Sequence, residues 1–148
     1  MVEKDAVIER QHYKGLAWVA SMALFMQSLD ATILNTALPT IATDLQTPVF
    51  EMQMAIIAYS LAVALFIPLT AWAAAKFGTL TVFRSAVFTF VFGSVACAMA
   101  TSLETLVLAR ILQGVGGAFM MPVARLAIIQ TVPKNQLINA WNLMATAG

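Results

Sequence analysis

Four long runs of apolar residues constrain the fold of this chain more than any other feature of its sequence. A bilayer with a hydrocarbon core about 30 Å thick needs about 20 helical residues to cross it, and each run has that length. Backbone groups inside the bilayer find no water to bind, so each run is expected to be helical. The predicted spans cover residues 16–38, 52–74, 80–100 and 103–124.

The composition agrees with a chain that lies in lipid. Of its 148 residues, 61% are hydrophobic and 10% are charged, whereas a soluble domain carries roughly 25% charged residues. This hydropathy excludes a soluble enzyme, and a net charge of +1 offers no basic patch for nucleic acid. The runs lack the strict apolar and polar alternation of a membrane β-barrel. We therefore predict an all-α, polytopic transmembrane helix bundle.

The sequence divides into a short tail and the bundle. Residues 1–15 mix acidic and basic side chains, which differs from the short basic start of a signal peptide, so they are predicted to be a cytoplasmic tail. Residues 16–148 are predicted to be a partial amino-terminal transmembrane bundle. A fifth apolar segment begins near residue 137 and has roughly twelve residues, too few to cross a bilayer.

The basic residues outside the apolar runs indicate the orientation in the membrane. They lie before the first run and around the second and fourth loops, whereas the first and third loops contain acidic residues only. Under the positive-inside rule the basic side is cytoplasmic, so the amino terminus is predicted to be cytoplasmic in a multi-pass protein of the inner (plasma) membrane. The basic residues are Lys4, Arg10, Lys14, Lys76, Arg125 and Lys134, together with Arg84 near the start of the third run.

Two ionisable residues lie deep inside the predicted spans, where each costs at least about 2.5–3.5 kcal/mol. Asp30 in the first span and Arg110 in the fourth are expected at a similar depth below the outer surface, and their charges are opposite. Gln27 and Gln113 lie one helical turn away from them. One interpretation is a salt bridge that only locks two helices; the other, which the polar neighbours favour, is a wet site that handles protons or substrate.

Small residues in the fourth span indicate close helix packing. Gly114 and Ala118 form a pair of small residues four apart, and Gly117 lies between them. Pro68 and Pro122 can bend their helices, because proline removes a backbone hydrogen bond.

The sequence has no pattern for catalysis or metal binding. It has no phosphate-binding loop, no nucleophile motif and no metal-ligand cluster, and His12 stands alone in the charged tail. We expect no enzyme activity, no metal and no cofactor.

Two stretches carry a resemblance to a known family. Residues 29–39, LDATILNTALP, resemble the first-helix motif of the fourteen-helix drug:proton antiporters of the major facilitator superfamily. The fourth span is similar to the fourth-helix motif of that superfamily through Leu106, Arg110, Gln113, Gly114, Gly116, Gly117 and Ala118. The resemblance implies the amino-terminal half of a transporter whose two helix bundles rock around a central cavity, with Asp30 and Arg110 facing that cavity.

The same resemblance implies an activity and its partners. The family exports lipophilic, often cationic compounds and is driven by proton entry, with a role in proton coupling for the arginine that here is Arg110. The expected partners are the lipid bilayer, a small lipophilic or cationic substrate and the remainder of the transporter. The proton gradient is the expected energy source.

The loop after the second span departs from the family pattern. The acidic residue of that motif is Ala75 here, and of the motif only Lys76 and Gly78 are retained. Because this loop helps to stabilise the outward-facing state in the family, its gating contacts are expected to differ in this chain.

Two other functions remain open at this point. One is a small exporter of four helices that acts as a dimer; the motif around Arg110 and the incomplete fifth segment count against it. The other is a truncation product without transport activity, or a membrane interaction subunit. Because members of the family are far longer than 148 residues, we expect the chain to be an amino-terminal fragment that is inactive alone.

Overall fold

The described part of the chain is helical throughout. The computed structural model describes residues 2–131, 138 and 142, with side chains described from residue 18 onward. The helices in this part are α1 (Val2–Asp44), α2 (Val49–Phe66), α3 (Leu69–Phe77), α4 (Thr79–Ala98) and α5 (Leu103–Thr131). No strand occurs among these residues. The predicted all-α helical bundle is therefore confirmed.

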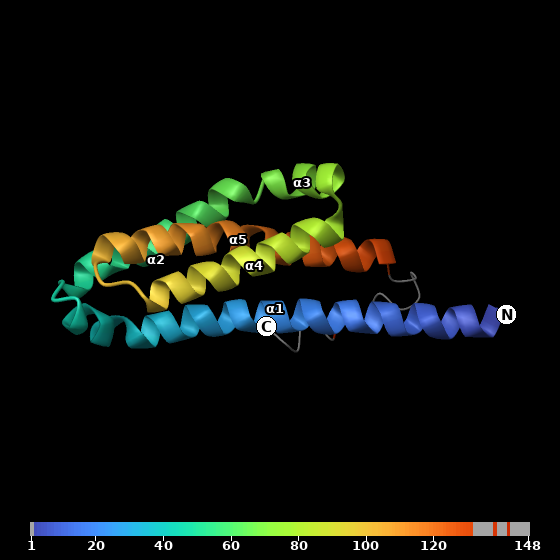
Figure 1. Ribbon diagram of the computed structural model, residues 1–148, viewed down its shortest axis with the longest axis horizontal. Coiled ribbons are helices and arrows are strands. Elements are labelled where there is room, and N and C mark those ends of the chain that lie inside the picture. The colour runs from blue at the N-terminus through green and yellow to red at the C-terminus, as the bar shows by residue number, and fades with distance from the viewer. Residues whose placement is uncertain (1, 132–137, 139–141, 143–148) are drawn as a thin grey trace.

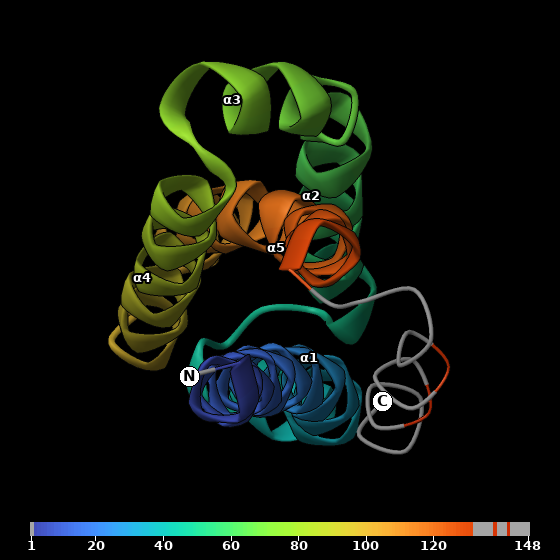
Figure 2. The same ribbon diagram turned by 90° about the vertical axis from the view of Figure 1, so that its right-hand side faces the viewer.

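The helices pass back and forth along one long axis, with α5 in the middle (Figure 1). Viewed along that axis, α1, α2, α3 and α4 surround α5, and α1 lies on the side opposite α3 (Figure 2). The turn between α3 and α4 lies at the same end as the end of α5, and the turns after α1 and α4 lie at the other end (Figure 1). Each long segment therefore crosses the bundle once, as a polytopic membrane protein requires.

Three helices of the described part are long and apolar enough to cross a membrane by length and composition: α2, α4 and α5 up to Gln130. Helix α1 is longer than any of them but carries Gln27, Ser28, Asp30 and Asn35 within its apolar run. These polar positions lower the hydropathy of its middle. The span at residues 16–38 therefore remains a prediction, although α1 runs alongside the other helices (Figure 1).

The first loop is shorter than the sequence predicted, because Pro39 lies inside α1 and does not end it. Proline removes one backbone hydrogen bond, a loss that favourable packing can outweigh. Beyond Pro39 the helix continues to Asp44 and buries Ala42 against Met52 and Ala55 of α2. Residue 38, the expected end of the first membrane span, is therefore not the end of the helix, and the loop covers residues 45–48.

The second apolar run forms two helices instead of one. Helix α2 ends at Phe66, and Pro68 precedes the first residue of α3, Leu69. The bend expected at Pro68 is thus a break between two helices. Gly78 alone joins α3 to α4 with a φ of 84°, a left-handed conformation that favours glycine. This requirement explains why Gly78 is present in a loop motif of which only Lys76 is otherwise retained.

Helix α5 begins with a reciprocal cap. The Thr105 backbone N–H donates to Ser102 Oγ at 3.3 Å, and the Ser102 N–H donates to Thr105 Oγ1 at 3.1 Å. The helix then continues through Pro122 to Thr131, past the predicted end of the span at residue 124. The predicted fourth loop and the start of the fifth segment lie outside the described residues.

Two apolar clusters hold the helices together, one toward each end. The first contains Leu24 of α1 and Met120 of α5, together with Phe90 of α4. The second contains Leu38 of α1 and Leu106 of α5. Asp30 lies between Leu24 and Leu38 along α1, and Arg110 lies between Leu106 and Met120 along α5. The polar residues are therefore enclosed on both sides by apolar packing.

Candidate functional site

Three helices contribute polar side chains to the middle of the bundle. Helix α1 carries Gln27 and Asp30 one turn apart, and α5 carries Arg110 and Gln113 at the same spacing. Helix α2 adds Tyr59. Because residues three apart lie on one face of a helix, each pair projects toward the opposite helix as a unit.

The central contact is an ion pair between α1 and α5. Arg110 Nη1 donates to Asp30 Oδ2 at 2.6 Å and to Gln113 Oε1 at 2.7 Å. Gln113 Nε2 donates to Asp30 Oδ1 at 2.8 Å. The three side chains therefore form a closed ring in which the amide of Gln113 bridges both charges. The structure brings together the pair that the sequence placed at a common depth.

Burial makes this ion pair sensitive to the loss of either partner. The Arg110 side chain is 3% exposed and the Asp30 side chain 18% exposed, and Gln113 is fully buried. Removing one member of a buried pair leaves the other charge without compensation, which is strongly destabilising. Among the described residues Arg110 Nε has no hydrogen-bond partner. The guanidinium group thus retains at Nε a buried donor that its present partners do not use.

A second hydrogen-bonded group lies one turn further along α1. Gln27 Nε2 donates to the Tyr59 hydroxyl at 3.1 Å and approaches the Gly117 carbonyl oxygen at 3.5 Å. The Arg110 guanidinium carbon lies 5.6 Å from the centre of the Tyr59 ring, within the range of a cation–π contact. Gln27 thus belongs to the same polar region as Asp30 and Arg110, joined to it through Tyr59.

The predicted packing residues of α5 lie at close helix contacts. A Cβ atom on Gly114 would come within 2.7 Å of the Tyr59 carbonyl oxygen, and one on Gly117 within 2.8 Å of the Tyr59 hydroxyl. Ala118 is fully buried. On the other side of α5, a Cβ on Gly116 would lie 2.5 Å from the Phe90 backbone nitrogen. Small residues therefore allow α2 and α4 to approach α5 from opposite sides.

The loop motif residues lie far from the polar site, at the α3–α4 turn. Lys76 Nζ lies 4.9 Å from the centre of the Trp72 ring and 5.5 Å from that of Phe77. Thr79 Oγ1 donates to Gln130 Oε1 at 2.8 Å, which joins the start of α4 to the last turn of α5. In place of a charged loop motif, this turn uses cation–π contacts and a neutral hydrogen bond.

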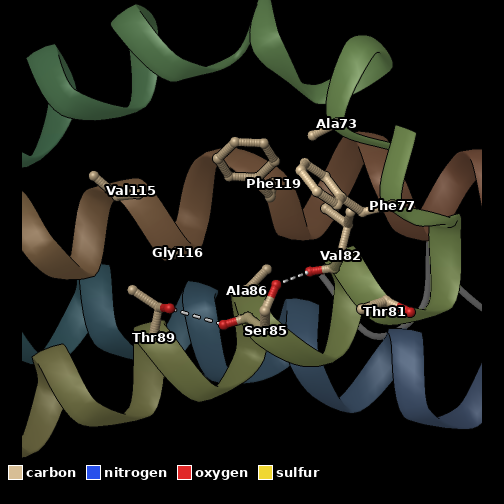
Figure 3. Close-up of a pocket in the computed structure, with 10 residues that line it drawn as sticks. All are labelled: Ala73, Phe77, Thr81, Val82, Ser85, Ala86, Thr89, Val115, Gly116 and Phe119. Carbon is tan, nitrogen blue, oxygen red and sulfur yellow. Dashed lines mark hydrogen bonds between the residues drawn. The ribbon is translucent and has the colours of Figure 1, made fainter. Parts of the chain in front are cut away.

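A cavity of about 280 Å³ lies on the other side of α5 from α1, between α3, α4 and α5. Figure 3 shows the Phe77 and Phe119 rings at this cavity, with Gly116 on α5. Along α4, Ser85 donates to the Val82 carbonyl oxygen at 2.9 Å and Thr89 to that of Ser85 at 2.8 Å (Figure 3). Hydroxyl groups that bind their own helix leave an apolar surface, and none of the described residues that line the cavity is titratable. Chemistry based on charge therefore belongs to the polar site.

Sequence reasoning missed three contributors to the polar site. Tyr59 lies in an apolar run, where a lone hydroxyl group was its only signal. Cys97 Sγ donates to Gln113 Oε1 at 3.6 Å, and a Cβ on Gly93 would come within 2.7 Å of Gln113 Cα. Both residues belong to α4, and their role depends on where α4 crosses α5. No local pattern reports that crossing point.

Comparison with known proteins gives a consistent family. A sequence model described as the Major Facilitator Superfamily matches residues 20–148. A relative from Haemophilus influenzae, named as a transport protein, HsrA, is 83% identical over 140 residues, which cover 95% of this chain and 30% of the relative. Relatives from Salmonella typhi and Yersinia pestis, named as multidrug resistance proteins, MdtD, are 44% identical over 131 residues, which cover 88% of this chain and 28% of each relative.

The matches cover most of this chain but only a small part of each relative. The chain spans less than a third of the length of each relative. No solved structure shows a significant match. The matching family and the printed names of these relatives are those of transport and multidrug resistance proteins.

Proposed function

The chain belongs to the major facilitator superfamily, and on this basis we propose that it forms part of an exporter that moves lipophilic or cationic compounds out of the cell and is driven by proton entry. The named multidrug resistance relatives support this substrate class. The ion pair between Asp30 and Arg110 is the observation that supports proton coupling best. It places a carboxylate, the simplest proton acceptor, opposite a buried cation inside the bundle.

A proton at Asp30 changes the forces between α1 and α5. When one carboxylate oxygen accepts a proton, the negative charge that attracts Arg110 disappears, and the guanidinium keeps only its neutral contacts. The 18% exposed side chain of Asp30 provides access for a proton, whereas the 3% exposed side chain of Arg110 remains enclosed. Proton uptake would therefore loosen the contact between α1 and α5, and we propose that this is a step in alternating access.

The test is export by a longer protein that carries this chain. A chimera would contain residues 1–148 in place of the matching segment of the Haemophilus influenzae relative, expressed in cells that lack their own exporters. Everted membrane vesicles would be assayed for uptake of a fluorescent lipophilic cation under an imposed proton gradient. We expect uptake by the chimera and none in Asp30→Asn, because an amide cannot accept the proton. Ser85→Ala in the apolar cavity is the matched control and should retain uptake.

Two results would contradict the proposal. Uptake in Asp30→Asn equal to that of the unaltered chimera would exclude Asp30 as the proton carrier. Uptake that does not respond to collapse of the proton gradient would exclude proton coupling itself. In either case the ion pair would be a structural lock between two helices.

We also propose that the 148-residue chain does not export by itself and that the rest of the transporter is its partner. Alternating access in this superfamily requires two bundles that move against each other, and the chain spans under a third of its relatives. The test expresses residues 1–148 alone, confirms membrane insertion and measures growth with lipophilic cations. Protection that is lost in Asp30→Asn would instead support a small dimeric four-helix exporter.

The proposed location is the inner (plasma) membrane with a cytoplasmic amino terminus, supported by the basic residues near the α3–α4 turn. Single cysteines at Lys76 and Asp44, each in a Cys97→Ala background, would be exposed to an impermeant thiol reagent on intact cells. Labelling is expected at residue 44 and not at residue 76. The reverse pattern would overturn the orientation.

A further inference from the structure

Tyr59 of α2 takes part in both groups of contacts around the polar site. Its hydroxyl accepts a hydrogen bond from Gln27 of α1 at 3.1 Å. Its ring lies 5.6 Å from the guanidinium carbon of Arg110 on α5. Gln27 and Asp30 are one turn apart on α1. Tyr59 contacts Gln27 directly, and it also contacts Arg110, the cation that pairs with Asp30.

The position of the ring matters because Arg110 is not fully satisfied by its hydrogen bonds. Nη1 makes two of them, whereas Nε is buried and has no partner among the described residues. An aromatic face within about 6 Å of a guanidinium attracts it, and more strongly where water is excluded. The ring of Tyr59 therefore compensates part of the positive charge of Arg110 that the Asp30 carboxylate and the Gln113 amide do not neutralise.

Helix α5 holds Tyr59 in place with two glycines one turn apart. A Cβ on Gly114 would lie 2.7 Å from the Tyr59 carbonyl oxygen, and a Cβ on Gly117 would lie 2.8 Å from its hydroxyl and 3.2 Å from Gln27 Nε2. No real Cβ atom approaches oxygen this closely without displacing it. The notch formed by Gly114 and Gly117 thus makes room for both the backbone and the hydroxyl group of Tyr59.

We propose that Tyr59 is a positioning residue: seated in the Gly114–Gly117 notch, it holds Arg110 with its ring and Gln27 with its hydroxyl, and so keeps α1 and α5 in register at the ion pair. The effect of this positioning on transport rests on the function proposed above. The positioning itself does not depend on that function. When Asp30 accepts a proton, the ring remains as a partner for Arg110. The guanidinium then stays in place and can pair with Asp30 again.

A spectroscopic measurement tests the positioning directly. The chain has two tyrosines, Tyr13 and Tyr59, so Tyr13→Phe labelled with 3-fluorotyrosine gives one fluorine resonance from Tyr59. The protein would be studied in lipid bicelles. Arg110→Lys, which keeps the charge but loses the planar guanidinium, and Gln27→Leu, which removes the donor to the hydroxyl, should each shift this resonance. Arg84→Ala, which alters an exposed arginine of α4, should not.

The outcomes of this measurement are distinct. Shifts in Arg110→Lys and Gln27→Leu but not in Arg84→Ala support the proposal. A resonance that is unchanged in the first two variants overturns it, because a ring that contacts neither partner cannot position them. Gln27→Leu keeps the test valid if the arginine variant fails to fold, since it alters no charge.

Transport by the chimera described above tests the consequence. Tyr59→Phe retains the ring and should keep most of the maximal rate of proton-driven uptake, whereas Tyr59→Leu should lower that rate roughly tenfold, the size expected for losing one buried cation–π contact. The half-saturating substrate concentration should change little in both. Equal losses in the two variants would show that the hydroxyl group lost in both carries the effect, and would contradict the role proposed for the ring. If the unaltered chimera does not export, the proposed function is wrong, and the fluorine resonance alone decides the positioning role.

Discussion

The two sides of α5 pack against their neighbouring helices through different kinds of contact. Toward α1 and α2, the helix presents Arg110, Gln113 and Gly117, and the contacts are charged or polar. Around the cavity of Figure 3, toward α3 and the first half of α4, it presents Gly116 and Phe119, and the contacts there are apolar. One helix therefore combines a charged and polar side with an apolar side.

Neighbouring glycines illustrate the difference. A side chain on Gly116 would collide with backbone atoms of α4, the Phe90 nitrogen at 2.5 Å and the Ala86 carbonyl oxygen at 2.8 Å. A side chain on Gly117 would meet the ends of two side chains, Tyr59 and Gln27. Backbone of a packed helix cannot move aside, whereas the end of a side chain can. The apolar side of α5 should thus be rigid at Gly116, and the polar side adaptable at Gly117.

The largest effect is expected from breaking the polar side at its centre. Arg110→Ala leaves the Asp30 carboxylate and the Gln113 amide without their shared partner, and we expect the free energy of unfolding to fall by about 3–5 kcal/mol. The measurement is equilibrium unfolding of the chain in lipid bicelles. Arg84→Ala, an exposed arginine on α4, is the control and should change stability by less than about 0.5 kcal/mol. Equal effects of the two substitutions would mean that the ion pair contributes nothing.

The next effect tests the rigidity of the apolar side. Gly116→Ala forces α4 and α5 apart because both close contacts are with backbone, and overpacking of this kind costs about 1–3 kcal/mol. The same unfolding measurement reports it. The separation of α4 and α5, measured between spin labels at one exposed position of each helix, should increase. A variant as stable as the original chain would show that the helices are less tightly packed than the structure indicates.

A smaller loss of stability is expected when Gly117, the residue next to Gly116 on the polar side of α5, is replaced by alanine. Gly117→Ala displaces the Tyr59 hydroxyl and Gln27 Nε2, both of which can rotate away, so the cost should stay below that of Gly116→Ala. The hydrogen bond between Gln27 and Tyr59 should nevertheless be lost. Unfolding and the fluorine resonance of Tyr59 measure the two consequences separately. If Gly117→Ala were the more damaging change, the assignment of a rigid and an adaptable side would be reversed.

The smallest effect is expected at the cavity between α3, α4 and α5. Ser85 donates its hydroxyl to the carbonyl oxygen of Val82 on its own helix, so Ser85→Ala removes no contact between helices. The free energy of unfolding of the Ser85→Ala variant should remain within about 0.5 kcal/mol of that of the original chain. A larger loss would indicate that the cavity has a polar partner, and that the two sides of α5 differ less than proposed.

The sequence predicted those features that depend on composition and on spacing along one helix. Long apolar runs gave the helical bundle, and equal depth with opposite charge gave the pairing of Asp30 with Arg110. Helix ends were predicted less well. Pro39 did not end α1, because packing of Ala42 against α2 outweighs one lost hydrogen bond, and Pro68 did more than bend its helix.

Residues contributed by a neighbouring helix could not be predicted from the sequence. Tyr59, Gly93 and Cys97 meet the polar site only because α2 and α4 cross α5 at particular positions. A crossing point depends on which small residues face each other, and that is a property of the packed bundle. The amide of Gln113 illustrates this: its position one turn from Arg110 was evident, but its bond to Asp30 required the approach of α1.

The most direct test of a single polar centre joining α1 and α5 is a double-mutant cycle. Asp30→Asn, Arg110→Gln and the combined variant would be compared with the original chain by equilibrium unfolding in bicelles. Because the two side chains share a hydrogen bond of 2.6 Å, the two losses should overlap, and the coupling energy should be at least about 1 kcal/mol. Losses that add within about 0.3–0.5 kcal/mol would show that Asp30 and Arg110 act independently, which would contradict the account.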